Sequence, residues 1–272
     1  MAILVGMLLL VIFSEYIVYP IALAVLAVIA VFEIFRVFGE QKRLVLSIPA
    51  YILAAACPIC AYFVSDALVM TFLLALAALV FVYLMWLMGV SVFSRGKIPF
   101  SKISEVFTAV CYVAVSFTSL SLMRYIDRTV GVFFVVLVFV ISWVCDVFAF
   151  AVGSLMGKHK LIPEISPKKT VEGAVGGIVF SALFCMLYGL VLEYIFGLSA
   201  NYLYLLLFGA ILSVVSQLGD LIASLIKREY GVKDYGRIFP GHGGVMDRFD
   251  SVLAVSTVLL ILSIVLPPFA AV

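Results

Sequence analysis

The chain consists of a series of apolar runs, each about 20 residues long, that short polar segments separate. A bilayer has a hydrocarbon core about 30 Å thick, which an α-helix of roughly 20 apolar residues crosses. Hydrophobic residues make up 66% of the chain and charged residues 12%, whereas a soluble domain is about half apolar and one quarter charged. The sequence therefore predicts an all-α polytopic membrane protein.

The apolar runs predict nine transmembrane helices. The first run has neither a basic segment before it nor a small-residue cleavage site after it, so we expect a retained span and not a signal peptide. Pro20 separates the first two runs, and because a proline can kink a span as well as end one, these two can be counted differently. The predicted spans lie at residues 2–19, 21–38, 46–64, 67–93, 104–123, 130–156, 171–197, 202–228 and 249–269.

The distribution of Lys and Arg predicts the orientation, because cytoplasmic loops carry the excess of both. The loops after the second, fourth, sixth and eighth spans share one side. All of the 17 basic residues except Arg124 and Arg128 fall on that side. We therefore expect the N-terminus and the polar cavity on the cytoplasmic side and the C-terminus outside. The expected location is a bacterial-type inner or plasma membrane.

No internal repeat, low-complexity segment or long linker divides the sequence, so a single membrane domain is expected. Within it, residues 1–128 form an N-terminal group of about five spans. Residues 129–272 form a C-terminal region of about four spans, with polar loops at 157–170 and 229–246, and this region holds most of the chemistry-bearing side chains.

Glu33 lies in or near an apolar run and Asp146 lies well inside one, where an unpaired charge is costly. Glu33 is three residues from Arg36, and an i,i+3 ion pair is sufficient to account for it. Asp146 has no such neighbour and needs a cation, a proton or water. A structural hydrogen bond to another helix would explain it, and so would a functional site.

The sequence ISPKKTVEG, at residues 165–173, precedes the seventh predicted span. Pro167 disfavours helix at the residue before it, so Thr170 is the expected N-cap and Glu172 lies in the first turn. Lys168 and Lys169 directly precede this helix. Free N–H groups and two ammonium groups together make an anion site, although basic residues are also common in any cytoplasmic loop.

The eighth span carries Gln217, Asp220, Ser224 and Lys227 at spacings of three, four and three residues, which places them on one helical face. A polar stripe on a membrane helix must face protein or water. In the next predicted helix, Asp247 and Asp250 also share a face.

The loop between these helices is rich in glycine and charge. Gly243 and Gly244 let the backbone approach a ligand closely. Carboxylate oxygens without thiolates favour Mg²⁺, which keeps waters and binds substrate phosphates, and Lys and Arg suit phosphate groups. The residues thus predict a membrane-embedded enzyme of phosphoryl or nucleotidyl transfer. A cation-coupled transporter is the alternative, and the net charge of only +2 argues against a nucleic-acid partner.

The segment from Ser224 to Asp250 reads S-x2-K-R-x4-K-D-x-G-x2-F-P-x-H-G-G-x2-D-R-x-D. It resembles the signature of the phosphatidate cytidylyltransferase (CDP-diacylglycerol synthase) family. The LGD ending at Asp220, the intramembrane Asp146 and the ISPKKTVEG sequence are also similar to that family. The resemblance covers about residues 140–260, and the N-terminal half shares only its hydrophobic spans.

The resemblance implies that CTP and phosphatidic acid react to CDP-diacylglycerol and pyrophosphate, with Mg²⁺ as cofactor and a second cation possible. It also implies a homodimer. A lipid or polyprenol kinase that uses CTP would share the same pocket but release CDP.

On this basis each polar residue receives a hypothetical role. The metal would be held by Asp220, Asp247, Asp250 and Asp146. The catalytic set would be Asp220, Asp247, Lys227 and Arg248. Substrate would be bound by Lys168, Lys169, Thr170, Ser224, Arg228, Lys233, His242, Gly243 and Gly244.

Overall fold

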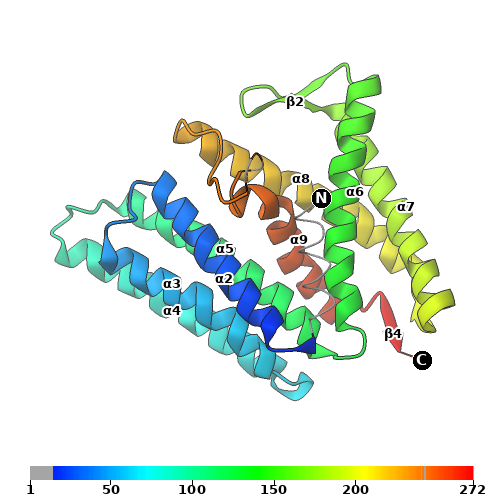
Figure 1. The fold of residues 1–272 in the computed structure, drawn as a ribbon, viewed down its shortest axis with the longest axis horizontal. Coiled ribbons are helices and arrows are strands. Elements are labelled where there is room, and N and C mark those ends of the chain that lie inside the picture. The colour runs from blue at the N-terminus through cyan, green and yellow to red at the C-terminus, as the bar shows by residue number, and fades with distance from the viewer. Residues whose placement is uncertain (1–14, 240, 242, 272) are drawn as a thin grey trace. The chain divides into compact units, whose positions relative to one another are not determined.

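The computed structural model describes residues 15–239, 241 and 243–271 (Figure 1). Among them, eight helices are long and apolar enough to cross a membrane, which confirms the all-α polytopic class. They correspond to the predicted spans after the first, and the first lies almost entirely outside the described residues. The helices are α2 (Val18–Val37), α3 (Leu44–Cys60), α4 (Val69–Phe93), α5 (Phe100–Ile126), α6 (Gly131–Met156), α7 (Val171–Phe196), α8 (Tyr202–Glu229) and α9 (Met246–Val265).

Two helix starts differ from the prediction in ways that matter. Helix α2 begins at Val18, so Pro20 lies in its first turn, where a missing backbone N–H removes no intrahelical hydrogen bond. Helix α9 begins at Met246, three residues before the apolar span predicted at 249–269, and Asp247 lies in its first turn, near the helix N-terminus as expected.

The chain divides into two compact units. The first comprises Met1–Arg128 and Asp234–Asp247. In it, α2, α3 and α5 pack against one another, and α4 packs on α5 (Figure 1). Short 3-10 turns, η2 (Ala61–Phe63) and η3 (Asp66–Leu68), connect α3 to α4.

The second unit comprises Thr129–Lys233 and Arg248–Val272. Helices α6 and α7 run side by side, and α8 packs against both (Figure 1). Glycines allow neighbouring helices to approach closely. A Cβ on Gly173 of α7 would lie 2.5 Å from the Ala149 carbonyl oxygen of α6, and one on Gly219 of α8 would lie 2.6 Å from the Asp250 carbonyl oxygen of α9. Any larger residue at these positions would force the helices apart.

Two small antiparallel ribbons, absent from the sequence prediction, extend the second unit. Strands β1 (Lys160–Ile162) and β2 (Ser166–Thr170) form a hairpin directly before α7, within the predicted loop 157–170. Strands β3 (Leu198–Ala200) and β4 (Phe269–Ala271) join the ends of α7 and α9. Most are only three residues long, too short for an alternating pattern to be recognised in the sequence.

Candidate functional site

The second unit contains an open cleft of about 260 Å³ that α6, α7, α8 and the β1–β2 hairpin line. Its walls combine apolar side chains with acidic and basic ones. The polar residues that line it are Asp146, Ser154, Lys168, Lys169, Thr170, Gln217 and Asp220. Five of these were predicted site residues, although they come from three separate stretches of sequence.

An ion pair lies in the cleft. The Lys169 Nζ is 2.7 Å from the Asp220 Oδ2, and both side chains are partly exposed, at 25% and 31%. On the same face of α8, the Ser224 hydroxyl donates to the Asp220 Oδ1 over 3.3 Å, so these two residues of the predicted stripe are in contact. The paired groups remain accessible from the cleft.

Further carboxylates lie within electrostatic range of this pair. Asp146 interacts electrostatically with both Asp220 and Lys169. Asp250 interacts with Asp220, Asp146 and Lys227. Three of the four predicted metal ligands thus belong to one electrostatic cluster of the second unit.

The N-terminus of α7 is built as predicted. The Thr170 side chain caps the helix by accepting the Gly173 N–H over 3.1 Å. Glu172, in the first turn, accepts the backbone N–H groups of Lys158 and His159 at 3.1 and 3.2 Å, and its Oε1 lies 2.6 Å from the His159 Nδ1. These bonds fix the base of the β1–β2 hairpin, which carries the cleft-lining Lys168 and Lys169.

Asp247, the fourth predicted metal ligand, lies in the first unit and is buried. Its Oδ2 accepts three backbone N–H groups, those of Tyr235 at 2.8 Å, Gly244 at 3.0 Å and Gly236 at 3.4 Å. Asp247 therefore organises the backbone of the signature segment. Its metal role stays a prediction.

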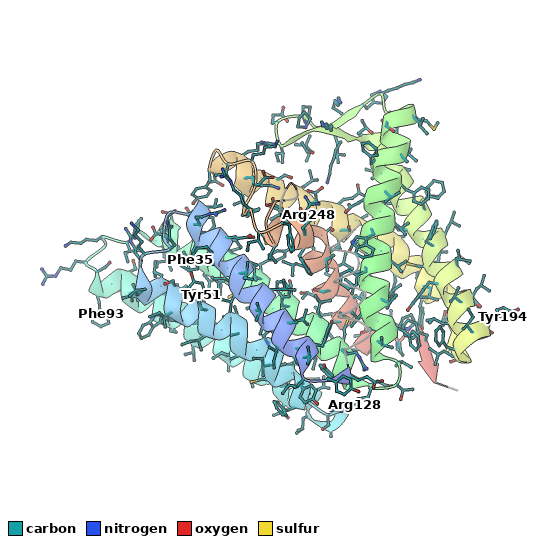
Figure 2. The ribbon with its side chains drawn as sticks, viewed as in Figure 1. Phe35, Tyr51, Phe93, Arg128, Tyr194 and Arg248 are labelled. Carbon is teal, nitrogen blue, oxygen red and sulfur yellow. The ribbon has the colours of Figure 1, made fainter. Side chains whose placement is uncertain are left out.

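The other predicted site residues have varied surroundings. Arg228 donates from its Nε to the Ile165 carbonyl of the hairpin turn over 3.3 Å. Lys233 is exposed, as is Arg248, which extends from the first turn of α9 (Figure 2). His242 lies outside the described residues.

Sequence reasoning gave Gln217 no role in the site, although the polar stripe contained it. Its side-chain amide donates to the Ala174 carbonyl over 3.2 Å and lines the cleft. It also assigned Glu33 the wrong partner. Glu33 accepts the backbone N–H groups of Val245 and Met246, while the Arg36 guanidinium donates to the Tyr235 carbonyl. A carboxylate inside an apolar run was the available signal, as it was for Asp146.

Within the described part of the chain, no three Asp, Glu, His or Cys side chains converge to hold a metal ion by themselves. The cleft does offer carboxylate oxygens, and a cation, the Lys169 ammonium, is already bound to one of them. This fits a Mg²⁺ site of the kind that needs one or two carboxylates plus waters and substrate phosphates.

Long apolar helices and a cleft lined by paired acidic and basic side chains define a polytopic membrane protein with a charged cleft. A model of the cytidylyltransferase family matches residues 1–266, and the chain belongs to this family. The family resemblance found in the signature segment is confirmed.

The chain is also similar to curated proteins that are each named phosphatidate cytidylyltransferase. That of Staphylococcus haemolyticus strain JCSC1435 is 40% identical over 178 residues, which cover 65% of both chains. That of Staphylococcus epidermidis strain RP62A is 43% identical over 174 residues, and that of Staphylococcus aureus strain COL is 42% identical over 175 residues. Each of these two matches covers 64% of both chains, so the chain spans just under two thirds of the length of these relatives.

Proposed function

We propose that the protein transfers the cytidylyl group of CTP to phosphatidate, which yields CDP-diacylglycerol and pyrophosphate. The observation that carries this proposal is the Lys169–Asp220 ion pair in the cleft, with Asp146 and Lys168 beside it. Family membership and the names of the relatives agree with it.

The main obstacle to this reaction is the repulsion between two anions. Phosphatidate is a phosphomonoester whose second pKa is about 6, so it is an anion near neutral pH and needs no strong general base. Lys168 and Lys169 would neutralise phosphate charge, and the N-terminus of α7 adds a positive dipole at the same wall. The apolar part of the lining, with Phe150 and Leu161, suits the lipid part of the substrate.

In the proposed step, an oxygen of the phosphatidate phosphate attacks the α-phosphorus of CTP. The new P–O bond gives CDP-diacylglycerol, while the bond from the α-phosphorus to its bridging oxygen breaks and pyrophosphate leaves. The basic residues of the site stabilise the charge that develops on the leaving group.

We also propose Mg²⁺ as cofactor. Asp220, with one of its neighbours Asp146 and Asp250 and with waters and substrate phosphates, would hold it, and a ligand role for Asp247 stays a prediction. The ion would neutralise the triphosphate and polarise its phosphoryl oxygens.

One assay tests the activity. Purified protein in detergent receives phosphatidate, CTP and Mg²⁺, and both nucleotide and phosphate products are identified. We expect CDP-diacylglycerol and pyrophosphate in equal amounts. Release of CDP would instead identify a CTP-dependent lipid kinase, and no CTP consumption together with ion-driven uptake in vesicles would identify a transporter.

Two further properties are proposed from the sequence. The cleft would open to the cytoplasm, with the N-terminus inside and the C-terminus outside, and tags at the two ends tested for accessibility in intact cells would reveal a reversed topology. The protein would act as a homodimer, and a mass measurement of the detergent complex that finds only monomer would contradict this.

A further inference from the structure

The Glu33 carboxylate, which belongs to helix α2, accepts hydrogen bonds from the backbone at the start of α9. Its Oε1 accepts the Val245 N–H over 3.1 Å and its Oε2 accepts the Met246 N–H over 2.9 Å. The residue is only 1% exposed. Helix N-termini leave N–H groups without intrahelical partners, and a carboxylate that accepts them forms strong, charge-assisted bonds. Glu33 therefore caps α9 although it is 212 residues from Val245 in sequence.

Two glycines of the signature segment make room for this carboxylate. A Cβ on Gly244 would overlap the Glu33 carboxyl group, whose atoms are the three nearest to it. A Cβ on Gly236 would overlap the same carboxyl group and also lie 2.7 Å from the Gly244 Cα. These positions need glycine because Glu33 approaches the backbone there.

Other charged groups of the same unit hold the backbone of the signature segment at residues 235, 236 and 244. The Asp247 Oδ2 accepts the N–H groups of Tyr235, Gly236 and Gly244. The Arg36 guanidinium, one helical turn after Glu33, donates to the Tyr235 carbonyl. Two side chains of α2 and one of α9 thus fix both ends of segment 235–246.

We propose that Glu33 is a positioning residue for the reaction: from α2 it holds the backbone at Val245 and Met246 and lies against Gly236 and Gly244. These residues adjoin the predicted substrate-binding Gly243 and the predicted metal ligand Asp247. The consequence for turnover rests on the function proposed above. The contact between Glu33 and the segment does not, so the two can be tested separately.

The first test is Glu33→Gln. A glutamine keeps one acceptor oxygen but directs an NH₂ group at the second N–H donor, so one of the two hydrogen bonds is lost together with the charge. The expected fall in kcat/KM is about ten- to a hundredfold, as for the loss of a charge-assisted hydrogen bond. Hydrogen exchange at the Val245 and Met246 amides should accelerate about tenfold or more, since local opening is no longer opposed by both bonds.

The matched control is Glu40→Gln, which removes another buried carboxylate of the first unit, one that pairs with Arg43 at 3.1 Å. It should keep both kcat/KM and the exchange rates at residues 245 and 246. A merely structural Glu33 would lower the thermal midpoint without changing the specific activity of the folded protein. That result, or unchanged exchange at residues 245 and 246, would overturn the proposal.

The second test is a double-mutant cycle with Gly244→Ala and Glu33→Asp. Aspartate withdraws the carboxyl group by one carbon–carbon bond, about 1.5 Å, which makes room for the new methyl group. The double variant should therefore be more active than Gly244→Ala alone. Losses that simply multiply would mean that the two sites are independent and would refute the contact.

If Glu33→Gln does not fold, the cycle still tests the contact, because partial recovery in the double variant can be read from yield and exchange, and the activity of the double variant relative to Gly244→Ala then tests the positioning role. Absence of any CTP-dependent activity in the unmodified protein would refute the proposed function. The exchange measurements would still judge the position of Glu33.

Discussion

Asp220 and Asp247 were both predicted to bind the metal and to act in catalysis, yet their surroundings differ. Asp220 is partly exposed in a cleft, and its partners are the side chains of Lys169 and Ser224, which can rotate away. Asp247 is buried, and its Oδ2 is held by three backbone N–H groups. The comparison distinguishes an accessible carboxylate, whose side-chain partners a ligand can displace, from a buried carboxylate that fixes the conformation of the backbone.

The largest expected effect is that of Asp220→Asn. Loss of its charge removes both the proposed metal ligand and the partner of Lys169, so we expect kcat to fall about a thousandfold, the upper range for losing one electrostatic stabiliser. The protein should remain folded because the side chain is partly exposed. The measurements are product formation and the thermal midpoint. Glu193→Gln, at the far end of α7, is the control. Activity retained at saturating Mg²⁺ would contradict the assignment of Asp220 as a metal ligand.

Asp247→Asn should lower turnover strongly and also loosen the signature segment, which sharpens the contrast with Asp220. Asparagine can still offer one oxygen to the three N–H groups, but the bonds lose their charge, at a cost of about 1–3 kcal/mol. Faster hydrogen exchange at Tyr235, Gly236 and Gly244 is the distinguishing measurement. Equal exchange in the Asp247 and Asp220 variants would remove the distinction.

Lys169→Gln removes the exchangeable partner itself. We expect kcat/KM for CTP or phosphatidate to fall about tenfold, because one phosphate contact made by an ammonium group is lost. Lys160→Gln is the matched control, since Lys160 is an exposed lysine of the same hairpin that does not line the cleft. Similar kinetics for both variants would show that only the general charge of the hairpin matters.

The smallest effect belongs to Thr170→Ala. Loss of an N-cap costs about 1 kcal/mol, so the thermal midpoint should fall by a few degrees. Because the Thr170 hydroxyl oxygen already accepts the Gly173 N–H, we expect its predicted contact with substrate to add little to turnover. Thr170→Ser should restore the midpoint because it keeps the hydroxyl group. A large loss of kcat with an unchanged midpoint would instead give the Thr170 hydroxyl a direct contact with substrate.

The eight described spans could be predicted because bilayer thickness sets helix length, and the Thr170 cap could be predicted because its signal is local. The polar stripe around Asp220 followed from helical periodicity alone. The division into residues 1–128 and 129–272, the metal and the substrate assignments stay predictions.

What sequence reasoning could not supply is contact between distant segments. Arg36 is the nearest opposite charge to Glu33 along the chain, and local spacing therefore suggested an ion pair. The actual partners, Val245 and Met246, are backbone groups, which carry no signature in a sequence. The hairpin of Lys160 to Thr170 is a local structure, and it was missed because its strands are too short to show a hydrophobic period.

The fit of Glu33 against Gly236 and Gly244 has a consequence for how this chain can vary over time. A side chain at position 244 would overlap the Glu33 carboxyl group, so a substitution there requires a shorter residue at position 33. Positions 33 and 244, although far apart in the chain, should therefore change together, and Gly236, which also lies close to the Gly244 backbone, should change last.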